Sequence, residues 1–152
     1  MVRFKFILPF LLLGAAVSCD REPCCCCESG CTQSNGMKWE NKPSTDPLQP
    51  HNVSQKGETL TFRCKSHKNV GIRYLQESGE LHMADDPKAL PSKIYGRQAS
   101  AYVEGDKLII YFSPYESANS PRDFIVSVGA GNAVETFYFR QYGKGVPPQP
   151  FY

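Results

Sequence analysis

Cysteine is the residue type in this chain with the widest reactive chemistry, and five of the seven cysteines lie within residues 24–31. Thiolates bind soft cations such as zinc or Cu(I), and in an exported protein they oxidise to disulfides. Zinc sites usually contain two spaced pairs of ligands, and a second pair is missing here. Disulfides or mixed oxidised thiols, a soft-metal site and no specific role therefore remain as three interpretations. The residues concerned are Cys24, Cys25, Cys26, Cys27 and Cys31.

Cys19 follows a leader of the kind that directs export. Arg3 and Lys5 give it a positive start, and the apolar run over 6–17 is shorter than the roughly 20 residues that span a bilayer. The segment resembles the lipobox of bacterial lipoproteins, which implies cleavage before Cys19 and lipidation of its thiol. More than one acyl chain is needed for stable anchoring, as a triacylated cysteine provides. An ordinary cleaved signal peptide is the alternative.

Exposed tyrosines are the only side chains that suggest a binding surface. Sugars stack on aromatic faces, and strand alternation points two tyrosines away from the expected core while a third lies in a loop. In small sandwiches, tyrosines also cap the core with a hydrated hydroxyl, which is the plainer interpretation. The candidates for glycan binding are Tyr111, Tyr115 and Tyr138.

Motifs for catalysis and for nucleic-acid binding are missing from the sequence. It contains no Gly-rich phosphate loop, nucleophile elbow or paired histidines at metal spacing. Lys and Arg number 17 in total, but Arg3 and Lys5 belong to the leader, so the remaining 15 balance 15 Asp and Glu. A near-neutral chain has no electrostatic footprint for nucleic acid. We therefore expect a protein that is not an enzyme, has no cofactor apart from the metal alternative above, and does not bind nucleic acid.

Period-two alternation indicates the elements that would position these residues. Apolar and polar residues alternate over 60–64, 107–113 and 124–128, and turn-forming residues separate these runs. No window shows apolar residues at helical spacing. The pattern predicts an all-β, antiparallel β-sandwich of about seven short strands, which the family resemblance described below further implies to be immunoglobulin-like.

The lipobox resemblance, the composition and the strand pattern together imply four segments. Residues 1–18 are a lipoprotein signal peptide, 19–47 a cysteine-rich and largely disordered tether, 48–143 the sandwich, and 144–152 a proline-rich tail. The tether is rich in Pro, Ser, Thr and Asn, which bury too little apolar surface to offset ordering entropy. Alternatively, the residues near 48–53, at the end of the tether, form a first strand that is partly docked on the sandwich.

The last third of the sandwich has a recognisable arrangement: a strand, a polar loop, Arg122 opening the next strand, and a closing strand that ends Gln141-Tyr142-Gly143. It resembles the BACON family, immunoglobulin-like domains of Bacteroidetes lipoproteins and glycan-degrading enzymes. The chain lacks the tryptophan that many members carry in the third strand. We expect Arg122 to hold the preceding loop. Because Gln141 shares a strand face with Phe137 and Phe139, we expect its amide to be buried against loop backbone, so both roles would be structural.

These observations predict a lipid-anchored cell-envelope protein, attached to the outer membrane as the resemblance implies. Its domain would be a non-catalytic binding module or spacer, with envelope proteins or glycans as partners. A carbohydrate-binding module is the first alternative. A soft-metal or redox-responsive protein that uses Cys24–Cys31 is the second.

Overall fold

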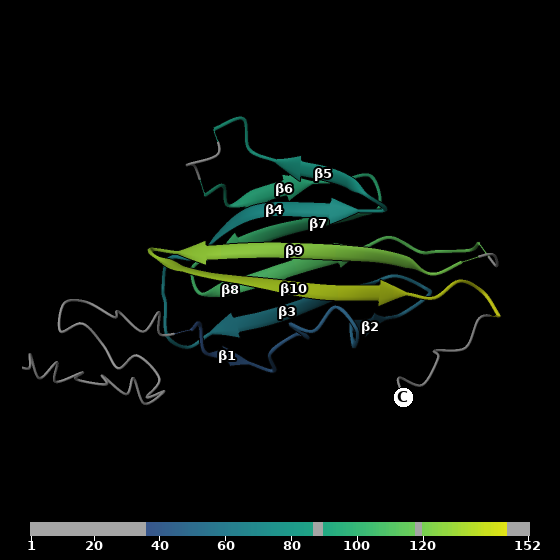
Figure 1. Ribbon diagram of the computed structural model, residues 1–152, viewed down its shortest axis with the longest axis horizontal. Helices are drawn as coiled ribbons and strands as arrows, with labels where there is room; N and C mark the ends of the chain where they lie inside the picture. The colour runs from purple at the N-terminus through teal and green to yellow at the C-terminus, as the bar shows by residue number, and fades with distance from the viewer. Residues whose placement is uncertain (1–35, 87–89, 118–119, 146–152) are drawn as a thin grey trace, which may run out of the picture. The chain divides into compact units, whose positions relative to one another are not determined.

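Two stacked β-sheets form the described part of the protein, which in this computed structural model comprises residues 36–86, 90–117 and 120–145. Sheet A has the order β1 (Trp39–Glu40), β3 (Glu58–Cys64), β8 (Lys107–Phe112), β7 (Ala99–Glu104), β6 (Lys93–Tyr95). Sheet B has the order β2 (His51–Val53), β10 (Ala133–Gln141), β9 (Arg122–Ala130), β4 (Gly71–Glu77), β5 (Glu80–Met83). In Figure 1, β9 and β10 of sheet B lie in front of β8 and β7 of sheet A.

The all-β sandwich predicted from the alternation is confirmed, with two differences in detail. Ten strands are described rather than about seven, and the additional ones are short, such as the two-residue β1 and three-residue β2. β2 pairs parallel with β10, whereas the other pairings among the described strands are antiparallel. Strands of two or three residues are too short for a period of two to show in the sequence.

The core lies between the sheets and is built on aromatic rings. Phe112 of sheet A packs against Phe124 and Phe139 of sheet B, with ring centroids 5.0 and 5.3 Å apart. All three rings are almost fully buried. Burial of such side chains from both inner faces is what stabilises a sandwich of this size.

The folded unit begins before residue 48, the boundary that the composition predicted. Met37 and Trp39 are buried, and β1 pairs with the end of β3, placing Trp39 opposite Cys64. The Trp39 ring meets Phe137 edge-on at 5.3 Å, and its Nε1 donates a hydrogen bond of 2.6 Å to Glu135. Residues 36–47 therefore belong structurally to the sandwich, although their polar composition is typical of a tether.

A two-residue turn joins β4 to β5 and sets the position of two polar side chains. Ser78 and Gly79 have positive φ angles of 48° and 87°, as a type I′ hairpin turn requires. The hairpin pairs Glu77 with Glu80 and Leu75 with His82, so Glu77, Glu80 and His82 share the inward face. No helix in the described ranges is long and apolar enough to cross a membrane.

We predict that Trp39→Ala lowers the free energy of unfolding by about 3 kcal/mol, because it removes a buried ring and leaves a cavity against Phe137. Urea denaturation measures this value. Leu48→Ala is the matched control, because Leu48 is 77% exposed and its truncation is expected to change stability by less than about 0.5 kcal/mol. Equal stability of the two variants would show that residues 37–40 are not part of the cooperative unit.

Candidate functional site

The outer face of sheet A carries a group of tyrosine and small hydroxyl side chains, which we name the tyrosine face. Cross-strand pairing sets them in two rows. One row is Tyr95–Ser100–Tyr111–Thr59, and the other is Lys93–Tyr102–Ile109–Thr61. Each row therefore crosses the four neighbouring strands β6, β7, β8 and β3.

Strand alternation turns these side chains outward. Their chain neighbours Ile94, Ala101 and Ile110 are buried in the core, so the intervening residues must point to the opposite side of the sheet. Tyr95 is 70% exposed and Tyr111 is 45% exposed. Among the described residues, no hydrogen bond to protein occupies the hydroxyl group of either tyrosine or of Tyr102. The face thus offers aromatic surfaces and hydroxyl groups to solvent.

The three tyrosines proposed from the sequence do not form one surface. Tyr111 lies on β8 of sheet A and Tyr138 on β10 of sheet B, so they point from opposite outer faces of the sandwich. Tyr115 lies in the loop after β8, where its ring is 4.5 Å from the Arg122 guanidinium and its hydroxyl donates to the Ser120 carbonyl. Alternation shows which side chains point outward, but it does not show which sheet a strand joins.

Sequence reasoning missed Tyr95 and Tyr102 as neighbours of Tyr111. Tyr95 belongs to the short strand β6, and Tyr102 alternates with the buried Ala101 and Val103 on β7. The alternation within β7 signalled that Tyr102 points outward. Only the cross-strand register shows that both tyrosines lie on the same face as Tyr111.

Arg122 and Gln141 form a buried polar pair at one end of the sandwich. Arg122 Nε donates to Gln141 Oε1 at 2.7 Å, and Arg122 Nη2 donates to the Ser113 carbonyl at 2.6 Å. Gln141 Nε2 donates to the carbonyls of Ser54 and Ser113. The burial of the Gln141 amide and the contact of Arg122 with the preceding loop both agree with what the sequence pattern indicated. Burial lowers the pKa of Arg122, an effect partly offset by Tyr115 and Glu77.

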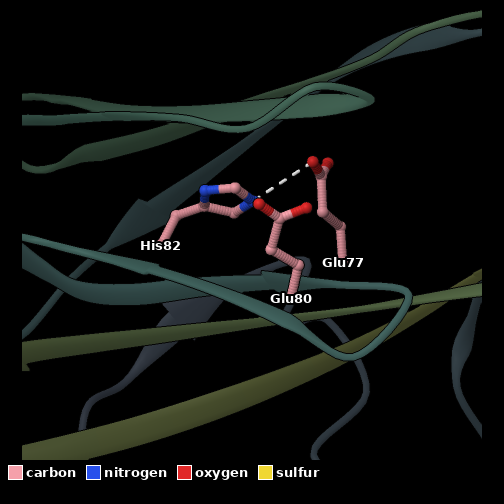
Figure 2. A group of neighbouring side chains, drawn as sticks. All are labelled: Glu77, Glu80 and His82. Carbon is pink, nitrogen blue, oxygen red and sulfur yellow. Dashed lines mark hydrogen bonds and ion pairs between the residues drawn. The ribbon is translucent and has the colours of Figure 1, made fainter.

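Glu77, Glu80 and His82 gather at the β4–β5 hairpin (Figure 2). One ligand atom from each lies within 4.8 Å of the others, a spacing that could hold a metal ion. Figure 2 shows the His82 ring directed toward the Glu77 carboxylate, and Nε2 lies 3.2 Å from Glu77 Oε1. Neither Glu77 nor Glu80 was identified from the sequence.

The Glu77 carboxylate is already satisfied by protein groups. It accepts backbone N–H bonds from Arg97, Gln98 and Ala99 at 2.5, 2.9 and 3.0 Å, in addition to the His82 contact. Gly96 lets the chain come this close, because a Cβ there would lie 2.7 Å from the carboxylate. Glu77 therefore works as an anchor that ties the turn before β7 to the end of β4.

Of the cysteines singled out in the sequence, Cys19 and the group Cys24, Cys25, Cys26, Cys27 and Cys31 lie outside the described residues. Most of the expected proline-rich tail also lies outside them. Cys64 is described and is a buried free thiol, 3.7 Å from the Ser66 hydroxyl. The disulfide, metal and lipid interpretations of the N-terminal cysteines therefore stay predictions.

Comparison with known proteins supports the fold. No family model matches the chain, and no curated protein matches it. A solved structure, described as the NMR structure of the protein from Bacteroides thetaiotaomicron, is similar with a TM-score of 0.60 and 27% sequence identity. The match covers 74% of this chain and 91% of the other. That description names a source and no activity, so the likeness bears on the architecture.

We predict that Glu77 makes stability dependent on pH in the acid range. Burial opposes ionisation of Glu77, but the backbone N–H groups and His82 outweigh it and lower its pKa below the ordinary 4.5. The carboxylate therefore contributes stability that is present above about pH 4.5 and is lost as pH falls through the lowered pKa. Urea denaturation between roughly pH 5 and 3 measures this dependence. The free energy of unfolding of Glu77→Gln should decrease less steeply with falling pH than that of the wild type.

Glu80→Gln is the control for this experiment, because Glu80 is exposed and accepts no backbone hydrogen bond in the described structure. The free energy of unfolding of the Glu80→Gln variant should change with pH as that of the wild type does. At neutral pH, Glu77→Gln should also lower the free energy of unfolding by about 1–3 kcal/mol, because the amide cannot accept every hydrogen bond that the carboxylate accepts. Parallel profiles for wild type and Glu77→Gln would contradict the anchor.

Proposed function

We propose that this chain is a lipoprotein of the bacterial cell envelope, anchored in the outer membrane through lipid on Cys19. Its sandwich acts as a non-catalytic binding domain displayed from that anchor. The leader supports the anchoring, because a basic start, a short apolar run and small residues directly precede the cysteine. The similarity to a Bacteroides structure is compatible with a bacterial origin.

The observation that favours binding over a plain spacer is the tyrosine face. Tyr95 and Tyr111 are large aromatic side chains held on regular strands and exposed by 70% and 45%. Aromatic side chains with a polar tip are enriched where proteins meet partners, because they offer contact area together with a hydrogen-bonding group. The two exposed rings, on strands separated only by β7, would offer such a contact area.

Membership of the BACON family is part of this proposal. Arg122 and Gln141, the residues that carry the resemblance, make a connected set of hydrogen bonds that links the closing strand to the loops after β8 and β2. Such a network gives a physical reason for an Arg at one strand start and a Gln at the next strand end. The resemblance therefore rests on residues that act together.

We predict that the wild-type chain incorporates a radiolabelled fatty acid in a bacterial host and sediments with membranes, while Cys19→Ser does neither. Removing the thiol removes the only atom to which diacylglycerol would be attached under this proposal. Cys31→Ser is the matched control, because it also removes one N-terminal thiol but should keep both label and sedimentation. Label that persists in Cys19→Ser, or a wild-type chain that never acquires label, would rule out the anchor.

A further inference from the structure

We propose that two copies of this chain associate edge to edge through β5, forming a closed dimer in which sheet B continues from one copy into the other. β5 is the last strand of sheet B, and it lies beside β6, the last strand of sheet A, along one side of the sandwich (Figure 1). The inference goes beyond the proposed anchoring and binding roles and depends on neither of them.

The backbone of β5 has unpaired hydrogen-bonding groups along its free edge. In a two-residue hairpin the residues that flank the turn form a hydrogen-bonded pair, and such pairs alternate along the strands. Glu80 and His82 therefore direct their N–H and C=O groups to β4, whereas Leu81 and Met83 direct theirs away from the sheet. Among the described residues, no hydrogen bond is made to these outward groups. They are free to pair with a second strand.

The other edge strands of the described structure carry features that oppose edge pairing, and β5 does not. β1 and β2 have only two and three residues, and Pro50 directly precedes β2. β6 has three residues and begins with Lys93. Short length, proline and lysine are common means by which proteins protect sheet edges. β5 has four residues, contains neither proline nor lysine, and pairs with β4 without a bulge. Its edge is therefore the least protected of the four.

Apolar side chains gather at this edge. Leu81 and Met83 are 52% and 49% exposed. Together with Tyr95 and Lys93, they line one open groove of about 440 Å³ between β5 and β6. An apolar centre with a polar surround is typical of the interfaces between identical subunits. The groove therefore fits a protein strand that carries apolar side chains.

A second copy of β5 supplies such a strand in a matching register. Antiparallel pairing about a two-fold axis at His82 places Leu81 opposite Met83 of the second copy, and Met83 opposite its Leu81. The outward N–H and C=O groups of these residues are then all used, and their side chains cover one another on one face. His82, at the axis, is already bound within its own chain, with Nε2 3.2 Å from Glu77 Oε1. The edge is thus self-complementary, as a two-fold interface requires.

The charges at the two ends of the edge are complementary under the same symmetry. Glu80 and Arg97 lie together at one end, with 3.7 Å between Oε1 and Nη2. At the other end, Lys93 lines the groove together with Ala84, and the exposed Asp85 follows Ala84 directly. Because the two-fold axis brings opposite ends together, Glu80 approaches Lys93 of the second copy. Arg97 and Asp85 form the corresponding second pair. This match favours a second copy over a strand from an unrelated protein.

Sedimentation equilibrium of the whole chain purified from a bacterial host, in density-matched detergent with a reducing agent, tests the proposal. The reducing agent removes disulfides among the N-terminal cysteines as a cause of association. We predict a reversible monomer–dimer equilibrium, because a four-residue edge gives a small interface. Leu81→Lys should raise the dissociation constant at least about tenfold, since it places a charge at the apolar centre. Val134→Lys is the matched control, because Val134 is 51% exposed on β10, away from the edge.

Charge reversal tests the two-fold arrangement separately. Glu80→Lys and Lys93→Glu should each weaken the dimer several-fold, because like charges then meet across the axis. The double variant Glu80→Lys/Lys93→Glu should regain most of the wild-type affinity. Urea denaturation of each variant checks that the fold is kept, as expected for side chains that are exposed in the single chain.

A wild-type chain that stays monomeric at every concentration would overturn the proposal and leave the edge to a strand of another protein. Equal dimerisation by Leu81→Lys and wild type, equal weakening by Val134→Lys, or a double variant without regained affinity would also overturn it. Growth beyond a dimer would contradict the closed pair. Cys19→Ser should dimerise as the wild type does, so failure of anchoring and failure of dimerisation are separate outcomes. A dimer that is lost in Cys19→Ser would be caused by the lipid and not by β5.

Discussion

Buried polar side chains of sheet B hold the loops of sheet A at one end of the sandwich, and the rest of the structure depends on this arrangement. Glu77 binds the backbone of residues 97–99, and Arg122 binds the carbonyl of Ser113. Ser113 N in turn donates to the Gln98 carbonyl, which links the two loops. A buried charge without partners costs several kcal/mol, whereas these charges are almost completely satisfied. The network therefore specifies how the sheets meet, beyond the non-directional apolar core.

The same network positions the tyrosine face. Ala99, whose N–H binds Glu77, directly precedes Ser100, and Phe112 and Ser113 directly follow Tyr111. Hydrogen bonds to buried side chains thus fix the start of β7 and the end of β8. Ser100 is paired with Tyr111 across these two strands. A surface on regular strands with anchored ends loses little conformational entropy when a ligand binds.

Alternation in the sequence was enough to predict the sandwich and the inward direction of Gln141, because both depend on a period of two within one strand. It could not bring Tyr95, Tyr102 and Tyr111 together, since that neighbourhood is set by pairing among β6, β7 and β8.

Glu77 was missed for another reason. It shares a face with the buried Leu75, but the N–H groups that make its burial favourable lie about 20 residues away in the chain. Trp39 was misplaced because its polar neighbours concealed a single buried ring.

The buried core and the proposed binding face lie on opposite sides of the same strands, and this separation has a consequence for the proposed role. On β8, Ile110 and Phe112 fill the core while Ile109 and Tyr111 face outward. Outward residues can change without altering the buried network, because only the inward set packs between the sheets. Substitutions of the outward tyrosines can therefore test the proposed binding role without disturbing the core.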